Sequence, residues 1–435
     1  MPMSNPKMSS LNLGLWAHNL TTDGKHIPNC QGCGANSLKL IMNVGDIPMV
    51  NGFTSDAHAA VNSTRFPADW LICNNCDLVQ LGFQVKRQII FPQNYSYTSG
   101  STQLKLENFQ DLFNESQSLV NLTPQSLIVD LGANDGSLLK LYSNAGYIAL
   151  GVEPTDVADK AKGAGIIMLK ERFNAKCARK IANNHGHAEI VCANNLLAHV
   201  EQFGEILNGV RILLKPNGVF IVEVQYLFDL IDNLGVDSIY HEHNRYYSLT
   251  TLEKQLSRYG FELFRAKHIQ THGGSIRLYL SYPGVQPLHP SVNKFRELEK
   301  ARGSVIDQLS QFVKKIETAR HELISLIHQI RGTSAKIFGI GAAPRTAALI
   351  NFLGIDNSMI DCVLEVPNSL KIGCYVPGTR IPVLEENHLI TQQPDYALMF
   401  SWHISDFLAT KLWNTGYMGK FLIPLPQPKS ISRDG

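Results

Sequence analysis

The chain has 435 residues, which is enough for roughly two to four domains. Hydrophobic residues make up 44% of it, so it can bury several cores and is not expected to be intrinsically disordered. The formal net charge of +2 argues against a protein that depends on a strongly basic surface, and the absence of about 18 consecutive apolar residues argues against a membrane span. The first residues show no charged-then-apolar signal pattern. We expect a soluble, cytoplasmic protein of several domains that binds neither nucleic acid nor a membrane.

Two Cys-x-x-Cys pairs stand in the first part of the chain; the cysteines are Cys30, Cys33, Cys73 and Cys76. In a reducing compartment such pairs indicate a metal site before they indicate disulfides. Each two-residue turn directs both sulfur atoms to one point, so the four thiolates can close a tetrahedral zinc site, which should be structural because no coordination position stays open. The alternative is four reduced, buried cysteines. Many turn residues and only short strand-like runs, such as 38–42 and 78–81, surround the pairs. We therefore predict a small zinc-binding domain over residues 1–94.

Strands alternate with helices in the next segment, 95–289, and this pattern is typical of a parallel sheet with helices on both faces. The expected strands are 126–131, 147–152, 189–193, 218–223 and 278–281, with helices over 137–145 and 203–214. Residues 290–332 have apolar residues at helical spacing among charges, which predicts one or two long helices that form a bridge. A second α/β unit is expected over 333–435, with a first strand over 336–340 and a last strand over 421–426 that prolines end.

A glycine-rich turn follows the first strand of the central segment, in the run Asp130-Leu131-Gly132-Ala133-Asn134-Asp135-Gly136-Ser137. A strand, turn and helix in this order place a ligand at the carboxyl edge of a parallel sheet, and Glu153 ends the next strand, where a carboxylate can accept hydrogen bonds from a ribose. The turn lacks the G-x-G-x-x-G pattern of dinucleotide sites, and Asp135 would repel a pyrophosphate. A purely structural turn is the alternative. We predict S-adenosylmethionine (SAM) as the cofactor, with contacts from Asp130, Gly132, Asn134, Glu153 and Asn194.

The segment Tyr240-His241-Glu242-His243 holds two imidazoles, a carboxylate and a phenol, and it follows the strand that ends in Glu223. It should therefore lie near the cofactor edge of the sheet. A histidine with an ordinary pKa of about 6.5 can remove a proton at neutral pH, and a neighbouring glutamate can orient its ring. The His-x-His spacing also allows a metal, but the adjacent tyrosine and glutamate favour acid–base chemistry. His199 follows another strand and could face the same pocket or simply be exposed.

Two more glycine-containing segments could contact an anion. In Thr271-His272-Gly273-Gly274-Ser275-Ile276-Arg277, backbone N–H groups, Ser275 and Arg277 could bind a diphosphate, although a plain β-turn is the alternative. The run Gly339-Ile340-Gly341-Ala342-Ala343-Pro344-Arg345-Thr346 is like half of a nucleotide-binding turn, and Arg345 could reach a phosphate. A lone GxGA run is weak evidence for a complete NAD(P) site.

The order of these motifs, up to the terminal Ile423-Pro424-Leu425-Pro426, resembles that of the nucleotide-diphosphate-sugar 3-C-methyltransferases of branched deoxysugar biosynthesis. The resemblance runs from about Cys30 to Ile431. It implies an α/β fold with a small N-terminal zinc-binding domain, a central class I SAM-dependent methyltransferase (Rossmann-like) domain and a C-terminal Rossmann-like domain. The substrate that it implies is a nucleotide-diphosphate 4-keto-deoxysugar, bound between the last two domains.

Carried over residue by residue, the resemblance implies His243 as the base, with Tyr240 and Glu242 beside it and His199 as a second histidine of the site. The 4-keto group acidifies the C3–H, since the carbanion delocalises as an enolate, and Tyr240 or His199 can donate a hydrogen bond to the enolate oxygen. This step needs no metal.

A tyrosine from the edge of the zinc-binding domain also enters the family's site, and here Tyr95 and Tyr97 both match. Two other classes stay open: a zinc-containing nucleic-acid methyltransferase and a non-catalytic zinc scaffold. The small net charge argues against the nucleic-acid methyltransferase, and the dense cluster around His243 argues against the non-catalytic scaffold. We expect a monomer or a small homo-oligomer, and the residues leave open which sugar is used and whether it carries GDP or dTDP.

Overall fold

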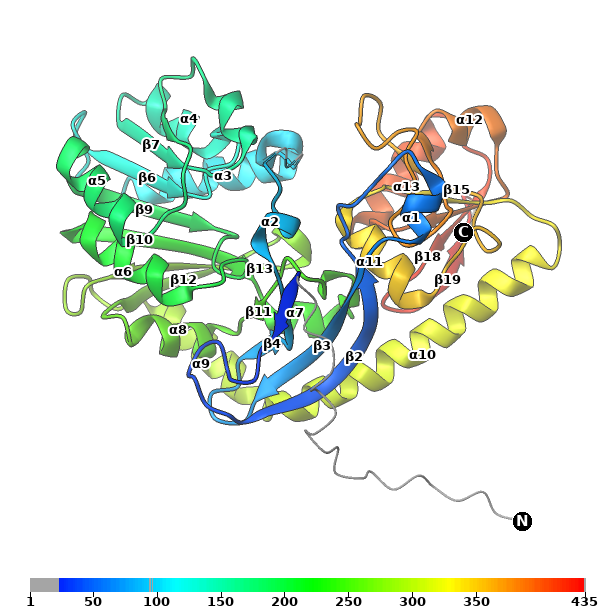
Figure 1. Cartoon of the computed structure of the whole chain (residues 1–435), viewed down its shortest axis with the longest axis horizontal. Helices are drawn as coiled ribbons and strands as arrows, with labels where there is room; N and C mark the ends of the chain where they lie inside the picture. Colours follow the sequence, from blue (N-terminus) through cyan, green and yellow to red (C-terminus); the bar gives the residue numbers. More distant parts are fainter. Residues whose placement is uncertain (1–22, 94, 96, 434–435) are drawn as a thin grey trace, which may run out of the picture.

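The computed structural model describes residues 23–93, 95 and 97–433, so the first 22 residues of the predicted zinc-binding domain lie outside it. The chain forms three parts, and a long helix, drawn in yellow, runs beneath the N-terminal sheet toward the C-terminal part (Figure 1).

The N-terminal part contains a four-stranded antiparallel sheet. Across the sheet its strands are β11 (Arg245–Tyr246), β4 (Val79–Leu81), β3 (Arg65–Cys73) and β2 (Leu38–Pro48). A two-stranded sheet and two short helices complete this part: β1 (Gly24–His26), β5 (Phe83–Val85), α1 (Ala57–Val61) and α2 (Arg87–Ile90). The strand β2 is much longer than the predicted run 38–42, and the sequence did not predict β3. The strand β11 comes from far outside residues 1–94.

The central part is built on a seven-stranded sheet. Its strands in order are β12 (Glu262–Ile269), β13 (Ser275–Ser281), β10 (Leu214–Gln225), β9 (Ala188–Asn194), β6 (Leu127–Leu131), β7 (Ile148–Val152) and β8 (Ile167–Leu169). Strands β10 to β8 are parallel, and β13 and β12 extend the sheet in antiparallel pairing. The predicted strands and the parallel sheet are thus confirmed.

Helices cover both faces of this sheet because alternate residues of each strand point to opposite faces. Ile128 of β6 packs with α3 (Gln103–Ser116) and α4 (Ser137–Asn144), whereas Val129 packs with α5 (Ala175–His185) and α6 (Phe203–Leu213). The remaining elements of this part are η2 (Ser99–Ser101), η3 (Asp156–Ala161), α7 (Leu227–Asp232), η4 (Val236–Ser238), α8 (Leu249–Ser257) and η5 (Thr271–Gly273).

Two helices follow, as predicted for residues 290–332: α9 (Pro290–Ala301) and α10 (Val305–Arg331). The buried residues of α10 recur every three or four positions, so one face of this long helix packs on the protein and the other meets water. Phe312 on the buried face lies 5.5 Å from Trp70 of β3, measured between ring centroids. In the part of the chain that the structure describes, no helix is long and apolar enough to cross a membrane.

The C-terminal part has a six-stranded sheet with helices around it. The strands in order are β16 (Val383–Glu385), β15 (Cys362–Glu365), β14 (Ile337–Ile340), β17 (Tyr396–Met399), β18 (Lys420–Ile423) and β19 (Lys429–Ile431). The helices are α11 (Pro344–Leu353), α12 (His388–Gln392), η6 (Trp402–Ile404) and α13 (Ser405–Asn414). The strand β18 ends directly before Pro424, as predicted, but the prediction that it is the last strand was wrong, because the chain turns and returns as the antiparallel β19.

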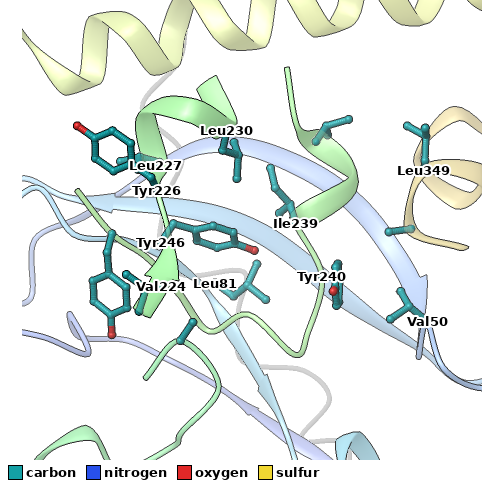
Figure 2. Packing of buried hydrophobic residues seen from close by; sticks show 14 of the residues in the cluster. Val50, Leu81, Val224, Tyr226, Leu227, Leu230, Ile239, Tyr240, Tyr246 and Leu349 are labelled. Atoms are coloured by element: carbon teal, nitrogen blue, oxygen red, sulfur yellow. The ribbon is translucent and has the colours of Figure 1, made fainter. Parts of the chain in front are cut away.

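Buried side chains of all three parts meet in one apolar cluster (Figure 2). Val50 and Leu81 come from the N-terminal part, Ile239 and Tyr240 from the central part and Leu349 from α11. The segment that leads to His243 is therefore anchored where the three parts join.

Candidate active site and zinc centre

The four predicted zinc ligands converge on one point. The sulfur atoms of Cys30 and Cys76 lie 3.6 Å apart, as do those of Cys33 and Cys73, and all four sulfur atoms lie within 4.8 Å of one another. A tetrahedral zinc ion with Zn–S bonds of about 2.3 Å separates its sulfur ligands by about 3.8 Å, so the cluster fits zinc. The backbone N–H groups of Gly32 and Cys33 each lie 3.4 Å from the Cys30 sulfur and donate to it, as expected for a thiolate ligand.

One residue of the first cysteine pair connects the zinc centre to the segment around His243. The Gln31 backbone N–H donates to the Gln80 side chain at 2.7 Å. Its side-chain Nε2 donates to the carbonyl oxygens of Leu81 and Asn244, each at 3.4 Å. Asn244 directly follows His243, so the zinc loop supports the segment that carries the predicted base.

The structure brings the predicted catalytic residues together just before β11. The ring centroid of His243 lies 4.4 Å from that of Tyr240 and 5.0 Å from that of His199. Glu242 comes from the same short segment and is buried. Residues from two loops, after β9 and after η4, thus line one site.

His243 is held as a neutral imidazole with a defined proton position. Its Nδ1 lies 2.7 Å from the carbonyl oxygen of Ser238, and because a carbonyl can only accept, Nδ1 carries the proton. Nε2 therefore carries the lone pair. Burial lowers the pKa of His243 to about 4, so the ring is uncharged at neutral pH and can accept a proton.

Glu242 interacts with two residues of the N-terminal part. Its carboxylate accepts hydrogen bonds from the Asn51 amide and, at 3.2 Å, from the Tyr95 hydroxyl. Burial raises the pKa of Glu242 to about 7, although both hydrogen bonds act in the opposite direction. Of the two predicted tyrosines, Tyr95 reaches this cluster. Tyr97 is 40% exposed, and its carbonyl accepts from the Asn134 amide at 3.1 Å. No sequence pattern had singled out Asn51.

His199 is held in place by hydrogen bonds to the backbone around it, and one nitrogen of its ring is unpartnered among the described residues. The Asn244 amide donates to the His199 carbonyl at 3.2 Å, and the buried Arg245 donates to the carbonyl oxygens of Leu197 and Val200 at 3.1 and 2.8 Å. The buried Nδ1 of His199 has no hydrogen-bond partner among the described residues. Burial lowers the pKa of His199 well below its usual value, so this ring is also neutral.

The predicted cofactor turn has the backbone that its glycines allow. Gly132, Asn134 and Gly136 all have positive φ angles, of 72°, 52° and 74°. Glu153 at the end of β7 supports the turn, because it accepts the Asn134 backbone N–H at 3.2 Å. Glu153 also accepts the backbone N–H and the hydroxyl of Thr155, at 2.9 and 2.7 Å.

Polar atoms without partners mark the same edge of the sheet. One carboxylate oxygen of Asp130 and both polar side-chain atoms of Asn194 are buried without a hydrogen-bond partner in the described ranges. Burial raises the pKa of Asp130 to about 8. Buried polar groups are normally paired, so these ends of β6 and β9 fit a polar, positively charged ligand such as the methionine part of SAM. Residues of the 97–100 loop cover the turn: Ser99 donates to the Asn134 side chain at 2.8 Å.

The structure does not bring Ser275 and Arg277 to this site. Arg277 is fully buried beside Glu223, its partner across β10 and β13, and donates to that carboxylate at 3.3 Å. Its other N–H groups bind acceptors on α3, and the Ser275 hydroxyl donates to the Thr271 carbonyl at 2.9 Å. These donors are used within the central part, so neither residue offers a free donor to a substrate.

Arg345 reaches the central part, but it binds a carboxylate there. Its Nε and Nη2 donate to the two oxygens of Asp237 at 2.9 and 2.7 Å, and its Nη1 donates to the His272 carbonyl at 3.3 Å. The indole N–H of Trp402 donates to the same carboxylate at 3.2 Å. Asp237 belongs to no motif, and the sequence offered no signal for it.

Three family models match the chain in succession. A putative zinc-binding domain covers residues 30–91, a methyltransferase domain 107–266, and the C-methyltransferase C-terminal domain 270–426. The C-methyltransferase NovU of Streptomyces niveus is 28% identical over 412 residues, which are 94% of this chain and 98% of the relative.

Two solved structures, of a methyltransferase and of another protein, resemble only part of the chain, at low sequence identity. The magnesium protoporphyrin IX methyltransferase of Synechocystis PCC 6803 with bound SAH is 15% identical with a TM-score of 0.32, over 41% of this chain and 84% of that one. The PH0226 protein of Pyrococcus horikoshii OT3 is 18% identical with a TM-score of 0.35, over 45% and 97%. From the three successive domain matches and the relative that spans the chain, we conclude that the chain is a SAM-dependent methyltransferase with a zinc-binding domain, a methyltransferase domain and a C-methyltransferase C-terminal domain.

Proposed function

We propose that the chain transfers a methyl group from SAM to C3 of a nucleotide-diphosphate 4-keto-deoxysugar, by way of an enolate. The neutral His243 imidazole carries this proposal, because its proton lies on Nδ1 and its Nε2 can accept. Methylation at carbon requires a carbon nucleophile, and a ketone provides one when a base removes the proton beside it. The site therefore has the group that such a reaction needs.

In this mechanism His243 Nε2 removes the C3 proton, and the electron pair of the C–H bond moves onto the ketone oxygen. Burial raises the pKa of Tyr240 well above its usual value, so its hydroxyl keeps its proton and can donate to the enolate oxygen. His199 is the alternative donor from the other side of His243. SAM supplies the methyl group: the C3 carbon forms a bond to it as the carbon–sulfur bond breaks.

Glu242 acts on the base without being the base. Its carboxylate is occupied by Asn51 and Tyr95, so it is held in place by the N-terminal part. Once His243 has taken up the proton, an ionised Glu242 stabilises the imidazolium, and a carboxyl with a pKa of about 7 can adjust its own charge near neutral pH.

The cofactor and the sugar nucleotide are assigned to two different sheet edges. For SAM we propose contacts from Asp130, Asn194 and Glu153, together with the Gly132–Gly136 turn. For the nucleotide we propose the carboxyl edge of the C-terminal sheet between the neighbouring strands β14 and β17. The strand that follows β14 in the chain, β15, lies on one side of this point, and the strand that follows β17, β18, lies on the other side. Ligands of open α/β sheets bind at such a switch point.

The experiment is incubation of the protein with SAM and 4-keto-deoxysugar nucleotides carrying GDP or dTDP. Mass spectrometry should show a sugar one methylene heavier, and NMR should place the new carbon on C3. His243→Asn should lose the activity. His241→Gln should retain most of it, because His241 in the same segment contacts the Pro67 carbonyl of the N-terminal sheet instead. Methyl transfer to oxygen, to nitrogen or to nucleic acid would overturn the proposal.

A further inference from the structure

A buried ion pair joins the C-terminal part to the residue that orients the base. Asp237 in η4 is only 1% exposed, and both of its carboxylate oxygens accept from Arg345 at the start of α11. Trp402 of η6 donates to the same carboxylate. Two elements of the C-terminal part thus hold one carboxylate of the central part.

The carbonyl of the next residue fixes His243. Ser238 accepts the His243 Nδ1–H at 2.7 Å and the Tyr246 hydroxyl at 3.3 Å through the same oxygen. Ser238 directly follows Asp237 in the chain, so a shift of the ion pair moves the acceptor that holds the proton on Nδ1.

We propose that Asp237 and Arg345 are positioning residues, which hold the Ser238 carbonyl in place and so keep His243 in the tautomer whose Nε2 can accept a proton. The base is then competent only while the C-terminal part is docked on the central part. The role of the tautomer in catalysis rests on the proposed function, whereas the tautomer itself can be observed without any substrate.

The charges around His243 make the two partners distinguishable. The titratable and charged groups that interact with the ring are Arg345, Asp237, Tyr240, Tyr246, His199 and His272. Arg345 disfavours protonation of the ring and Asp237 favours it. Removing Arg345 should therefore raise the pKa of His243, and removing Asp237 should lower it further.

The first test is NMR of the full-length protein with 15N-labelled histidine, without substrate. The His243 signals, identified by their loss in His243→Asn, should show a protonated Nδ1 and a bare Nε2. Asp237→Asn and Arg345→Gln should shift the ring toward a mixture of tautomers. The matched control is Arg302→Gln, which removes an exposed Arg–Asp pair with Asp232 and should leave the tautomer unchanged. An unchanged tautomer in both ion-pair variants would overturn the proposal.

The second test is methyl transfer by the same variants as a function of pH. Asp237→Asn and Arg345→Gln should each lower kcat, by up to about 100-fold, with little change in the KM for the sugar nucleotide. The acid limb of the profile should move to higher pH in Arg345→Gln and to lower pH in Asp237→Asn. Arg345→Lys should recover part of the rate. The proposal would be overturned if the acid limbs of the two pH profiles moved in the same direction. It would also be overturned if KM rose in Arg345→Gln alone, because that result would assign Arg345 to the phosphates of the sugar nucleotide.

Folding is checked with SAM itself, because the cofactor edge does not include the ion pair. Each variant should bind SAM with the wild-type dissociation constant by calorimetry. If the wild type methylates no sugar nucleotide, the proposed function fails while the NMR result still decides the role of the ion pair. If the wild type is active and both variants keep full activity, the positioning role alone is wrong.

Discussion

The carboxylate of Glu153 has room for one ribose hydroxyl and no more. A carboxylate offers about four acceptor positions. Three are filled by donors of the chain: the backbone N–H groups of Asn134 and Thr155 and the Thr155 hydroxyl. The remaining position can accept one charge-assisted hydrogen bond, worth about 1.5–3 kcal/mol. Glu153→Ala should therefore weaken SAM binding by about 10- to 150-fold.

The assay is calorimetry with S-adenosylhomocysteine and its 2′-deoxy and 3′-deoxy analogues, on the wild type and on Glu153→Ala. In the wild type, one of the two analogues should bind more weakly by the same factor as the substitution causes. In Glu153→Ala that analogue and the parent compound should bind alike, since the acceptor is gone. Thr155→Val serves as the control, because it removes a donor to the same carboxylate but not the free acceptor position. Equal affinity of all three ligands for the wild type would refute the assignment of Glu153 to the ribose.

Three further results are expected. Purified protein should hold one zinc ion per chain by elemental analysis, and Cys73→Ser should lose it and melt at a lower temperature; zinc-free wild-type protein would contradict the site. With S-adenosylhomocysteine and the 4-keto sugar nucleotide in deuterium oxide, the wild type should exchange the C3 proton for deuterium, and His243→Asn should do so about 10²- to 10⁴-fold more slowly. If His243→Asn exchanged at the wild-type rate, the base would be His199 or Tyr240 instead. Burial raises the pKa of Glu242 to about 7, so this carboxyl binds its proton more tightly in the folded than in the unfolded protein. The stability of the wild type relative to Glu242→Gln should therefore be greatest below about pH 4.5 and fall by up to about 3 kcal/mol as pH rises through 7. A constant difference in melting temperature over that range would exclude this effect.

The elements with strong periodicity were predictable from the sequence. The buried strand β6 and the helix α4 follow from an apolar run, a glycine-rich turn and a helical spacing that all agree. The convergence of the cysteine pairs was predictable for a similar reason, because two short turns fix the direction of all four sulfur atoms. Local patterns sufficed wherever neighbouring residues determine the geometry.

The sequence could not predict contacts between residues that are distant in the chain. Arg277 has the donors of an anion ligand, but its register opposite Glu223 directs it into the interior of the sheet, which no local pattern reveals. The choice between Tyr95 and Tyr97 depended on which of them meets Glu242, a residue about 150 positions further along. Arg345 was expected to meet a phosphate because the buried carboxylate of Asp237 could not be foreseen.

The strand β11 has a consequence for how such enzymes can be recombined. Its two residues pair with β4 of the N-terminal sheet, but they lie within the methyltransferase segment, shortly after His243. A chimera that exchanges the zinc-binding domain alone would pair a foreign edge with the native strand and disturb the loop that ends in His243. We expect functional hybrids between relatives only when residues 30–91 and 239–248 are exchanged together. The segment that must be exchanged as one unit is therefore discontinuous in the chain and does not coincide with the domain boundary.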